Sequence, residues 1–510
     1  MFLLSMLRRF APFIALIALV ALYAVWLLFP ITIITADIGR HVMDGRVLLG
    51  HSEWWRALLT TNFYSASNPD FPAINHHWAA GIFYTVILSA FGWSGLHLFS
   101  IALGCAAFAL ILDISRRLSN WWIALFIGLS LLPVIAYRLE VRPEFMGYAL
   151  LGIAYWTLHR VAREGASIRL LWLLPPLIVL WVNIHASFPV GLALIGLFTV
   201  DTLLRRDPHT KMFAAVLGVS VLATLLNPAG IRGALYPLSI LHDPGYAVLE
   251  NQSMFFLGTV GVQPFTFLLT KIAAVDFVIA IGILGMLKKL REAFPYVAVA
   301  ALTLLMAMLA VRHITLWGIA AVPVFCLAIR ALLQKFPTWK QTFLISGVVL
   351  AVACTGLQLW HLSHRWIVLG LEPTANNAAH FIKSHEIHGP FFNNFDIGGY
   401  MVYHFFPQER PFVYNMPEAH PSDFWRSVYI PMMQDNVVWQ EQLSKYDFNA
   451  IVLFHGDRTG WGQEFLVARL QDPQWAPVFV DRSIIVLVRR NGKNGDVITQ
   501  FEIPRSQLLK

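Results

Sequence analysis

Long uninterrupted runs of apolar residues are the feature that most limits what this chain can fold into. Eleven such runs can be traced along the 510-residue sequence. A helix of about 20 apolar residues crosses the roughly 30 Å hydrocarbon layer of a bilayer. The chain is 57% hydrophobic and 13% charged, whereas soluble domains average about 25% charged residues. The sequence therefore predicts a polytopic α-helical membrane protein.

Positive charge predicts the topology of these spans. The spans are expected at residues 11–33, 96–115, 120–137, 145–162, 169–184, 188–204, 211–226, 263–287, 294–311, 314–333 and 341–360. A further apolar stretch, 79–94, is predicted to be a juxtamembrane helix at the outer interface. That choice puts four basic clusters on the same inner side as Arg8 and Arg9, as the positive-inside rule favours: Arg116–Arg117, Arg160–Arg169, Arg205–Arg206 and Lys288–Lys289. We expect eleven spans, with the N-terminus inside and the C-terminus outside.

Two domains are expected from the change in composition near residue 360. Residues 1–360 form the predicted transmembrane domain, with a first outer loop at 35–95. From 361 to 510, short β-rich runs alternate with turn residues and helical patterns, which is typical of a small α/β domain outside the membrane. Within it, Gly398–Tyr400 is predicted to be a tight turn that uses the conformational freedom of glycine.

Charge and cysteine content exclude some classes of function. The formal charge is +8, but the basic residues lie between apolar blocks, where they set topology. We therefore expect no nucleic-acid partner. Cys105, Cys326 and Cys354 lie within apolar segments and are predicted to be small packing residues. No disulfide or zinc framework is indicated.

Ionisable residues gather where the first span ends. If residues 35–50 form a helix, Asp37, Arg40, His41 and Asp44 share one face at spacings of three and four. One interpretation is an interfacial amphipathic helix whose charges are solvated. The other is a functional site, because ionisable residues at the membrane are costly unless they are paired or line a water-filled cavity.

Two further groups lie on the same predicted outer side. His76 and His77 directly precede the juxtamembrane helix, and Arg138, Glu140, Arg142 and Glu144 follow a predicted span. The arginines could be snorkelling at a helix end. They lie, however, on the side where topology does not favour positive charge, which argues for a role beyond orientation.

The order of these motifs resembles the GT-C glycosyltransferases, and above all an uncharacterised bacterial branch similar to the protein O-mannosyltransferases and the lipid A aminoarabinose transferases. The resemblance covers nearly the whole chain and rests on short motifs: the outer Asp37 with Arg40 and His41, YRLEVRPE (137–144), WVNIHAS (181–187), LLNPAG (225–230), Arg312–His313 and FNNFDIGGY (392–400). One departure is FVYNMPEAH (412–420), where an acidic element is expected after the glycines.

The resemblance implies an enzyme that moves a sugar from a polyprenyl-phosphate donor to a glycan, lipid or protein acceptor at the outer membrane face. It implies Asp37 as the general base. Cations must stabilise the departing phosphate, and guanidinium groups bind phosphate through paired hydrogen bonds. The candidates for this task are Arg40, His76, His77, Arg138 and Arg142. The branch also implies the bacterial inner membrane, with the C-terminal domain in the periplasm.

The metal requirement is left open by the sequence. Glu144 lies where metal-using relatives carry a second acidic motif, and Mg²⁺ or Mn²⁺ held with Asp37 is one alternative. A metal-free site assisted by arginine is the other. His41, His185, Arg312 and His313 are further candidates for contact with substrate or metal. For His185, the alternative of a hydrogen-bonded histidine at a helix break is favoured over substrate contact.

Two other functions compete with the transferase. A transporter or flippase for lipid-linked saccharides would use the same arginines without breaking a bond. Against it, no inverted repeat is visible, and the ionisable residues gather at one face and not at the bilayer midplane. A scaffold for envelope assembly is the second alternative, and a scaffold would tolerate the loss of the Asp37 carboxylate.

Overall fold

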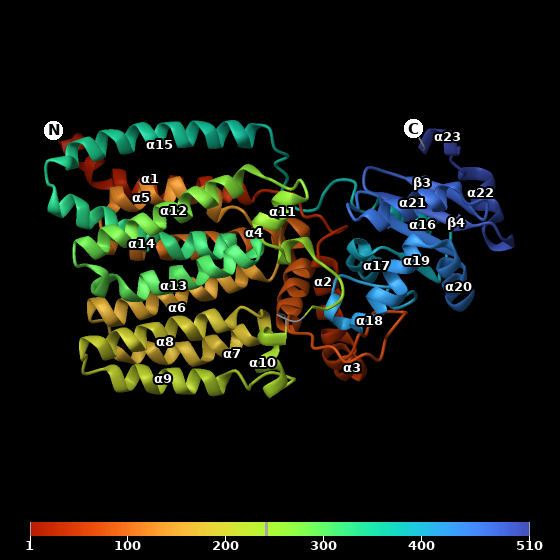
Figure 1. Ribbon diagram of the computed structural model, residues 1–510, viewed down its shortest axis with the longest axis horizontal. Helices are drawn as coiled ribbons and strands as arrows, with labels where there is room; N and C mark the ends of the chain where they lie inside the picture. Colours follow the sequence, from red (N-terminus) through yellow and green to blue (C-terminus); the bar gives the residue numbers. More distant parts are fainter. Residues whose placement is uncertain (1, 240–242, 509–510) are drawn as a thin grey trace. The chain divides into compact units, whose positions relative to one another are not determined.

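The computed structural model describes residues 2–239 and 243–508, which belong to two compact units (Figure 1). Unit 1 comprises Met1–Phe29, His97–Ala234 and Val248–Leu369. Unit 2 comprises Pro30–Leu96, Leu235–Ala247 and Gly370–Lys510. The second unit therefore combines the C-terminal part of the chain with the first long loop.

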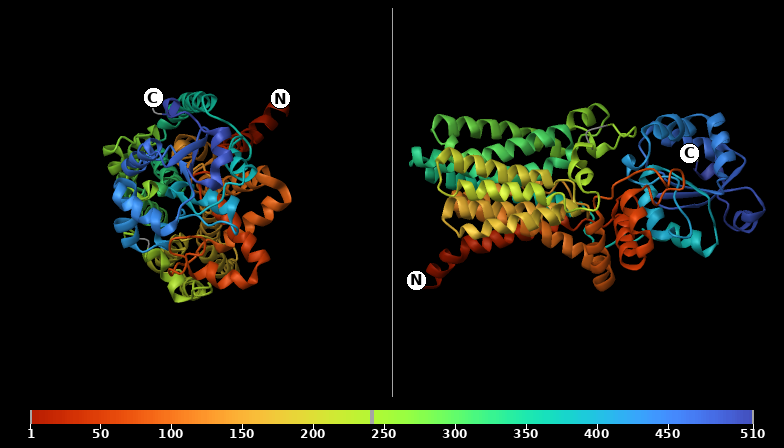
Figure 2. Two further views of the ribbon diagram at one scale, coloured as in Figure 1. Left: turned by 90° about the vertical axis from the view of Figure 1, so that its right-hand side faces the viewer. Right: turned by 90° about the horizontal axis from the view of Figure 1, so that it is seen from below.

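Unit 1 is a bundle of helices that run side by side (Figures 1 and 2). Its main elements are α1 (Phe2–Leu27), α5 (Trp121–Ile135), α6 (Glu144–Glu164), α7 (Leu174–Ile184), α8 (Phe188–Arg205), α9 (Thr210–Ala223), α12 (Phe265–Met286), α13 (Leu290–Leu309), α14 (Ile314–Lys335) and α15 (Trp339–Ser363). Short 3₁₀ turns and helices join them: η2 (Ile168–Leu173), η3 (Leu249–Asn251), α11 (Met254–Thr259) and η4 (Val311–His313). Two more helices, α4 (Trp78–Leu118) and α10 (Ile231–Ser239), have residues in both units.

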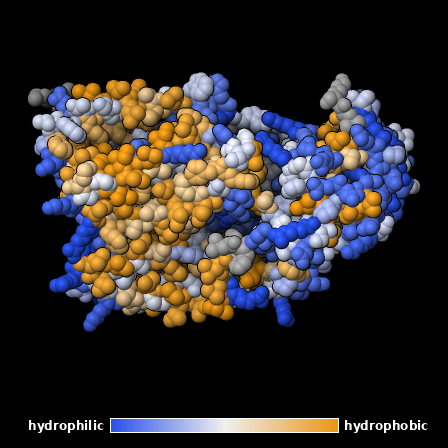
Figure 3. Space-filling model, viewed as in Figure 1, coloured by the Kyte–Doolittle hydropathy of each residue, from blue (hydrophilic) through white to orange (hydrophobic). Residues whose placement is uncertain are grey.

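Each of the eleven predicted spans contains a helix, but the number of membrane crossings stays a prediction. Among the described residues, six helices are long and apolar enough to cross a bilayer: Trp78–Leu118, Phe188–Arg205, Phe265–Met286, Leu290–Leu309, Val311–Lys335 and Trp339–Ser363. Shorter apolar helical segments are Ala11–Leu27, Trp121–Ile135, Ile168–Ile184 and Thr210–Ala223. Figure 3 shows that hydrophobic residues dominate the visible surface of this bundle, as expected for an integral membrane protein.

Local residue types end and bend these helices. Gly92 (φ 66°, ψ −171°) has non-helical torsion angles and kinks α4. The helical segment before the kink contains most of the predicted juxtamembrane stretch 79–94. The segment after the kink contains the predicted span 96–115. Asn120 caps α5 by accepting a hydrogen bond from the Ile123 amide at 3.0 Å. Gly165 ends α6 in the left-handed conformation (φ 67°).

Unit 2 is built around a four-stranded mixed sheet in the order β1-β2-β4-β3. The strands are β1 (Phe391–Asn393), β2 (Ala450–Phe454), β3 (Trp475–Val480) and β4 (Ile484–Arg489). Only β1 and β2 are parallel, with Phe392 opposite Ile451. The helices and turns of this part are α16 (Asn377–Ser384), η5 (Phe395–Ile397), α17 (Gly398–Phe405), η6 (Pro417–Ala419), α18 (Ser422–Phe424), η7 (Trp425–Tyr429), α19 (Ile430–Gln434), α20 (Asn436–Tyr446), α21 (Gly460–Gln471), η8 (Gly492–Asn494), α22 (Gly495–Phe501) and α23 (Arg505–Leu508). The sheet confirms the predicted α/β character of this region.

The first long loop packs into unit 2 through α2 (Ile38–Gly50), η1 (Ser52–Trp54) and α3 (Trp55–Thr60). Helices α2 and α17 cross at glycines, since a methyl group on Gly39 would lie 2.7 Å from the Gly399 carbonyl oxygen. Around this crossing, Met43, Phe63 and Tyr64 join Phe406 and Tyr414 in one buried cluster. The packing fixes the start of α2 against the segment that carries FNNFDIGGY.

The prediction of a tight turn at Gly398–Tyr400 is wrong. Gly398 has helical torsion angles (φ −59°, ψ −39°) and begins α17. The glycine is needed for space, because a methyl group there would lie 2.6 Å from the Val413 carbonyl oxygen. A methyl group on the next residue, Gly399, would lie 2.7 Å from Asn415 Oδ1.

Candidate functional site

Asp37 is the N-cap residue of α2 in unit 2. Its carbonyl oxygen accepts a hydrogen bond from the His41 amide at 3.0 Å, so the first turn of the helix begins at this residue. The Asp37 carboxylate is half-buried. The predicted helix over 35–50 is therefore present from Ile38 on, and Asp37 lies at its start.

Arg40, His41 and Asp44 form a buried group on α2. Arg40 is 4% exposed and Asp44 is fully buried, and Arg40 Nη1 donates to Asp44 Oδ2 at 3.2 Å. His41 Nδ1 lies 3.8 Å from the same oxygen. Burial, followed by the charge of Arg40, lowers the pKa of His41. These three side chains are therefore not a solvated face, and the alternative of a simple interfacial helix is wrong for them.

His76 and His77 belong to the same unit. Their rings are 3.8 Å apart, and the His77 ring lies 4.9 Å from that of His41. On its other side His76 packs against Tyr236 at 4.2 Å, whose hydroxyl donates to Glu418 Oε1 at 2.6 Å. Unit 2 thus brings together Asp37, Arg40, His41, His76 and His77.

Asp396, in the FNNFDIGGY motif, was not singled out by sequence reasoning as a site residue. Burial, followed by the charges of Asp457 and Asp37, raises the pKa of Asp396 to about 7. Asp457 is itself buried and accepts a hydrogen bond from the Asn394 amide group at 3.1 Å. The electrostatic field at Asp37 therefore includes the carboxyl group of Asp396 from the C-terminal part of the chain.

A second cluster lies in unit 1, in the loop between α5 and α6. Arg138 Nη2 donates to Glu144 Oε1 and to Glu250 Oε2, both at 2.9 Å. Burial by itself would lower the pKa of Arg138, but Glu250 and then Glu144 raise it well above its usual value. Arg138 is therefore a permanent cation held between two carboxylates.

Glu250 is the common partner of the arginines in this cluster. Arg142 Nη1 lies 3.3 Å from Glu250 Oε2, and Arg312 Nη1 lies 4.0 Å from Glu250 Oε1. Burial would raise the pKa of Glu250, but Arg138, Arg142 and Arg312 together lower it to about 2. Sequence reasoning missed Glu250, because it lies in a long loop without any motif and its partners are more than 60 residues away in the chain.

The remaining polar groups of unit 1 border this cluster. Arg142 Nε donates to Glu140 Oε2 at 2.7 Å, and Arg312 Nη1 donates to Asn251 Oδ1 at 2.8 Å. The Ser187 amide donates to His185 Nδ1 at 3.1 Å. The ring proton of a neutral His185 is therefore on Nε2, 3.9 Å from Glu144 Oε2.

The cluster joins residues from four segments of unit 1: 138–144, 185–187, 250–251 and 312–313. His313 follows Arg312 directly in η4 and shares an electrostatic field with His185 and Glu144. The predicted residues that meet here are Arg138, Arg142, Glu144, His185, Arg312 and His313. Their charges balance, since three arginines face Glu140, Glu144 and Glu250.

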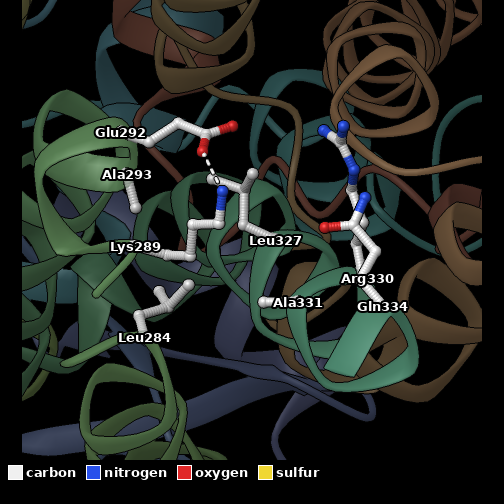
Figure 4. A pocket seen from close by; sticks show the side chains of 8 residues that line it. All are labelled: Leu284, Lys289, Glu292, Ala293, Leu327, Arg330, Ala331 and Gln334. Atoms are coloured by element: carbon white, nitrogen blue, oxygen red, sulfur yellow. Dashed lines mark hydrogen bonds and ion pairs between the residues drawn. The ribbon is translucent and has the colours of Figure 1, made fainter. Parts of the chain in front are cut away.

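A pocket at the other end of the same helices is too small for a sugar. It lies among α12, α13 and α14, and its volume of about 10 Å³ is the room for one water molecule (Figure 4). Lys289 and Glu292 form an ion pair at 3.2 Å beside it. Arg330 and Gln334 border it near the end of α14, whereas Arg312 precedes the start of that helix.

A metal centre is not preformed in either unit. Within the described residues, no group of three or more histidine, cysteine, aspartate or glutamate side chains is arranged to hold a metal ion. In unit 1 the arginines occupy the carboxylates that a divalent cation would need, because Glu144 and Glu250 both bind Arg138. The side chains of this unit therefore do not fit a divalent cation as they stand.

Comparison with known proteins identifies the fold. No protein-family model matches the sequence, and no curated protein matches it. The archaeal oligosaccharyltransferase AglB from Archaeoglobus fulgidus, in complex with an inhibitory peptide and a dolichol-phosphate, superposes with a TM-score of 0.64 and 10% identity. The match covers 93% of this chain and 74% of AglB. ArnT from Cupriavidus metallidurans, bound to undecaprenyl phosphate, has a TM-score of 0.54 and 14% identity over 94% of this chain and 98% of ArnT.

The chain has the fold of the GT-C membrane transferases. A third neighbour, the A. fulgidus oligosaccharyltransferase in complex with Zn and sulfate, has a TM-score of 0.59 and 12% identity, covering 91% of this chain and 71% of that one. The GT-C fold thus extends over both units. This confirms the resemblance that the short motifs indicated.

Proposed function

We propose that the protein is a glycosyltransferase that moves a sugar from a polyprenyl-phosphate donor to an acceptor at the outer face of the membrane. The observation that carries this proposal is the arginine cluster of unit 1. Arg138, Arg142 and Arg312 come from distant segments and converge on one carboxylate, that of Glu250. Convergent guanidinium groups are the usual protein ligands of a phosphate group.

The GT-C neighbours support a lipid-linked donor. AglB was solved with a dolichol-phosphate and ArnT with undecaprenyl phosphate. A phosphate anchored by a polyprenyl chain places its head group at the membrane surface, next to the ends of the spans. In unit 1 the arginines lie shortly before α6 and α14, which supports binding of such a head group. We therefore assign donor-phosphate binding to Arg138, Arg142 and Arg312.

The chemistry assigned to Asp37 is general base catalysis. The acceptor hydroxyl attacks the anomeric carbon, the bond from that carbon to the phosphate oxygen breaks, and the polyprenyl phosphate leaves with the bonding electrons. The hydroxyl proton passes to the Asp37 carboxylate. The arginines stabilise the negative charge that develops on the leaving oxygen.

Arg40, His41, His76 and His77 are assigned roles around Asp37. Arg40 is buried and hydrogen-bonded to Asp44. We therefore propose that it positions the first turn of α2 and does not contact the lipid phosphate. The histidine rings stack in a row from His41 to His76 and are proposed to border the acceptor. We further propose the bacterial inner membrane, with the N-terminus in the cytoplasm and unit 2 in the periplasm.

The experiment is a transfer assay with the purified full chain in liposomes. A panel of radiolabelled polyprenyl-phosphate sugars is offered together with membrane acceptors. We expect Asp37→Asn to lose transfer while it still binds the donor. The matched control is Asp70→Asn, because Asp70 is an exposed acid in the same loop, and it should retain transfer. Equal transfer by wild type and Asp37→Asn would remove Asp37 from the mechanism, and donor flipping without transfer would favour a transporter.

A further inference from the structure

Helix α12 presents two contrasting faces. Its buried residues are Phe267, Thr270, Ala273, Phe277, Ala280 and Leu284, which recur every three or four positions and pack into the bundle. The opposite face is exposed, and Leu268, Ile272, Val275, Ile279 and Met286 on it are 50–78% exposed. Spacings of four, three, four and seven residues place these side chains on one stripe along the helix.

An acidic residue interrupts the exposed side of α12 at its middle. Asp276 is exposed, and it is the twelfth of the 22 residues from Phe265 to Met286. α12 is one of the helices long and apolar enough to cross a membrane. Asp276 therefore lies about 16 Å from either end of the helix at 1.5 Å per residue, near the centre of the hydrocarbon layer.

Among the side chains that the structure describes, Asp276 has no counter-charge within its own unit. In the described part of the chain, no ion pair or side-chain hydrogen bond involves its carboxyl group. Lys271 is five residues earlier, so it is rotated by about 140° around the helix and points elsewhere. The Lys271 ammonium group lies over the Phe255 ring, 5.2 Å from the ring centroid.

An unpaired acidic residue such as Asp276 is costly within a membrane span. Ionisable side chains within membrane spans usually face a bundle interior or a water-filled cavity, and they are paired. A protonated carboxyl group would also need a hydrogen-bond partner, because hydrocarbon offers none. An exposed stripe with an unpaired acid at mid-depth is therefore an incomplete helix–helix interface.

We propose that this stripe of α12 docks a single transmembrane helix of a partner protein, and that the partner carries a lysine or arginine at the depth of Asp276. Charge complementarity selects this occupant. In a dimer of two copies inserted the same way, α12 would meet a parallel α12, and Asp276 would face Asp276 of the other copy. Two carboxylates repel each other at this depth, whereas a carboxylate and a basic residue attract each other.

The test uses two synthetic transmembrane peptides and the full chain in liposomes. Both peptides are poly-leucine helices, and one has a single lysine at its centre. The protein carries p-benzoylphenylalanine at Ile279, one turn from Asp276 on the exposed stripe. We expect the lysine peptide to give at least fivefold more photocrosslinked product than the all-leucine peptide, and Asp276→Leu to reduce that product to the all-leucine level.

A matched variant tests whether the stripe itself matters. Val352 is 69% exposed near the middle of α15, and Asp276→Leu with Val352→Asp moves the acid there, with the photoprobe at Val349. We expect little crosslinking from this variant. Equal product would mean that any exposed acid suffices and would overturn the proposal.

Three other results would also overturn the proposal. The first is equal crosslinking of the two peptides to the wild type. The second is crosslinking between two copies of the chain that Asp276→Leu abolishes, which would make a second copy the occupant. The third is a lower melting temperature of Asp276→Leu in detergent, because it would reveal an internal partner. We expect that variant to be at least as stable as the wild type.

Discussion

Arg138 and Glu250 are 112 positions apart in the chain, and their side chains meet at 2.9 Å. The same guanidinium group also binds Glu144 at 2.9 Å. Without a ligand, the cations assigned to the donor phosphate are thus already neutralised by glutamates. A phosphate that enters this cluster must compete with Glu250 for the arginines. We expect the phosphate to displace Glu250 and not Glu144 from the arginines, because the Glu250 side chain is 23% exposed and that of Glu144 only 11%.

We expect Glu250→Gln to have opposite effects on stability and on phosphate binding. The variant keeps the size of the side chain but removes the negative charge that the three arginines share. It should lose roughly 1–3 kcal/mol of unfolding free energy and bind decyl phosphate about tenfold more tightly, equivalent to ~1.4 kcal/mol. Thermal unfolding at several decyl phosphate concentrations measures both quantities.

The control is Glu140→Gln, since Glu140 pairs with Arg142 and is 33% exposed. Glu140→Gln should change the unfolding free energy and the affinity for decyl phosphate less than Glu250→Gln does. Weaker phosphate binding by Glu250→Gln would contradict the competition, and it would indicate that Glu250 orders the arginines for the ligand.

The pair Arg40–Asp44 should behave as a buried ion pair. Both side chains are almost fully enclosed in unit 2, so Asp44→Leu alone leaves an uncompensated cation and should cost roughly 3–5 kcal/mol. Arg40→Met with Asp44→Leu should recover a large part of that loss. A double-mutant cycle by denaturant unfolding gives the coupling energy, expected between about 0.5 and 3 kcal/mol. Additive losses would show that the two groups do not interact.

Much of the helical architecture could be predicted from sequence, because apolar runs report burial in lipid directly. The predicted spans 188–204 and 294–311 lie on α8 (Phe188–Arg205) and α13 (Leu290–Leu309). The number of crossings could not be fixed in this way. Helices such as α9 (Thr210–Ala223) are apolar but short, and composition does not say whether they span.

The candidate site was predictable only where its partners are local. The spacing of Arg40 and Asp44 predicted that they share one face of a helix, and the structure shows the two side chains paired there. Their burial depends on Phe63, Tyr64 and Met416, which come from other segments. Glu250 was missed for the same reason, since three distant arginines give it its role and no local pattern marks it.

The crossing of α2 and α4 should not tolerate a side chain at Gly45. A methyl group there would overlap with the Gly81 carbonyl oxygen and the Thr85 hydroxyl, whose Oγ1 donates to the Val42 carbonyl oxygen at 2.7 Å. Gly45→Ala should cost roughly 1–3 kcal/mol by overpacking and should impair transfer by moving the helix that starts at Asp37.

Gly50 offers the matched control on the same helix, because nothing lies within 4 Å of a methyl group there. Gly50→Ala should stabilise the protein by about 0.4–1 kcal/mol, since alanine restricts the unfolded chain. Thermal unfolding of both variants makes the comparison. A stable Gly45→Ala protein would mean that α2 can move away from α4 at no cost.

Asp396 should make the stability of the protein depend on pH. Its pKa in the folded protein is about 7 because of burial and the nearby charges of Asp457 and Asp37, whereas an unfolded aspartate titrates near pH 3.9. Between these values the folded state holds a proton that the unfolded state has lost. Stability from this group is therefore fully present below about pH 4 and declines as the pH rises to about 7.

Asp396→Asn removes the titration and should have a higher melting temperature than wild type at pH 8, with the difference shrinking toward pH 5. Asp447→Asn is the control, because the Asp447 side chain is 78% exposed. A melting temperature of Asp396→Asn that follows the wild type at every pH would show that the Asp396 carboxyl group is ionised in the folded protein across this range.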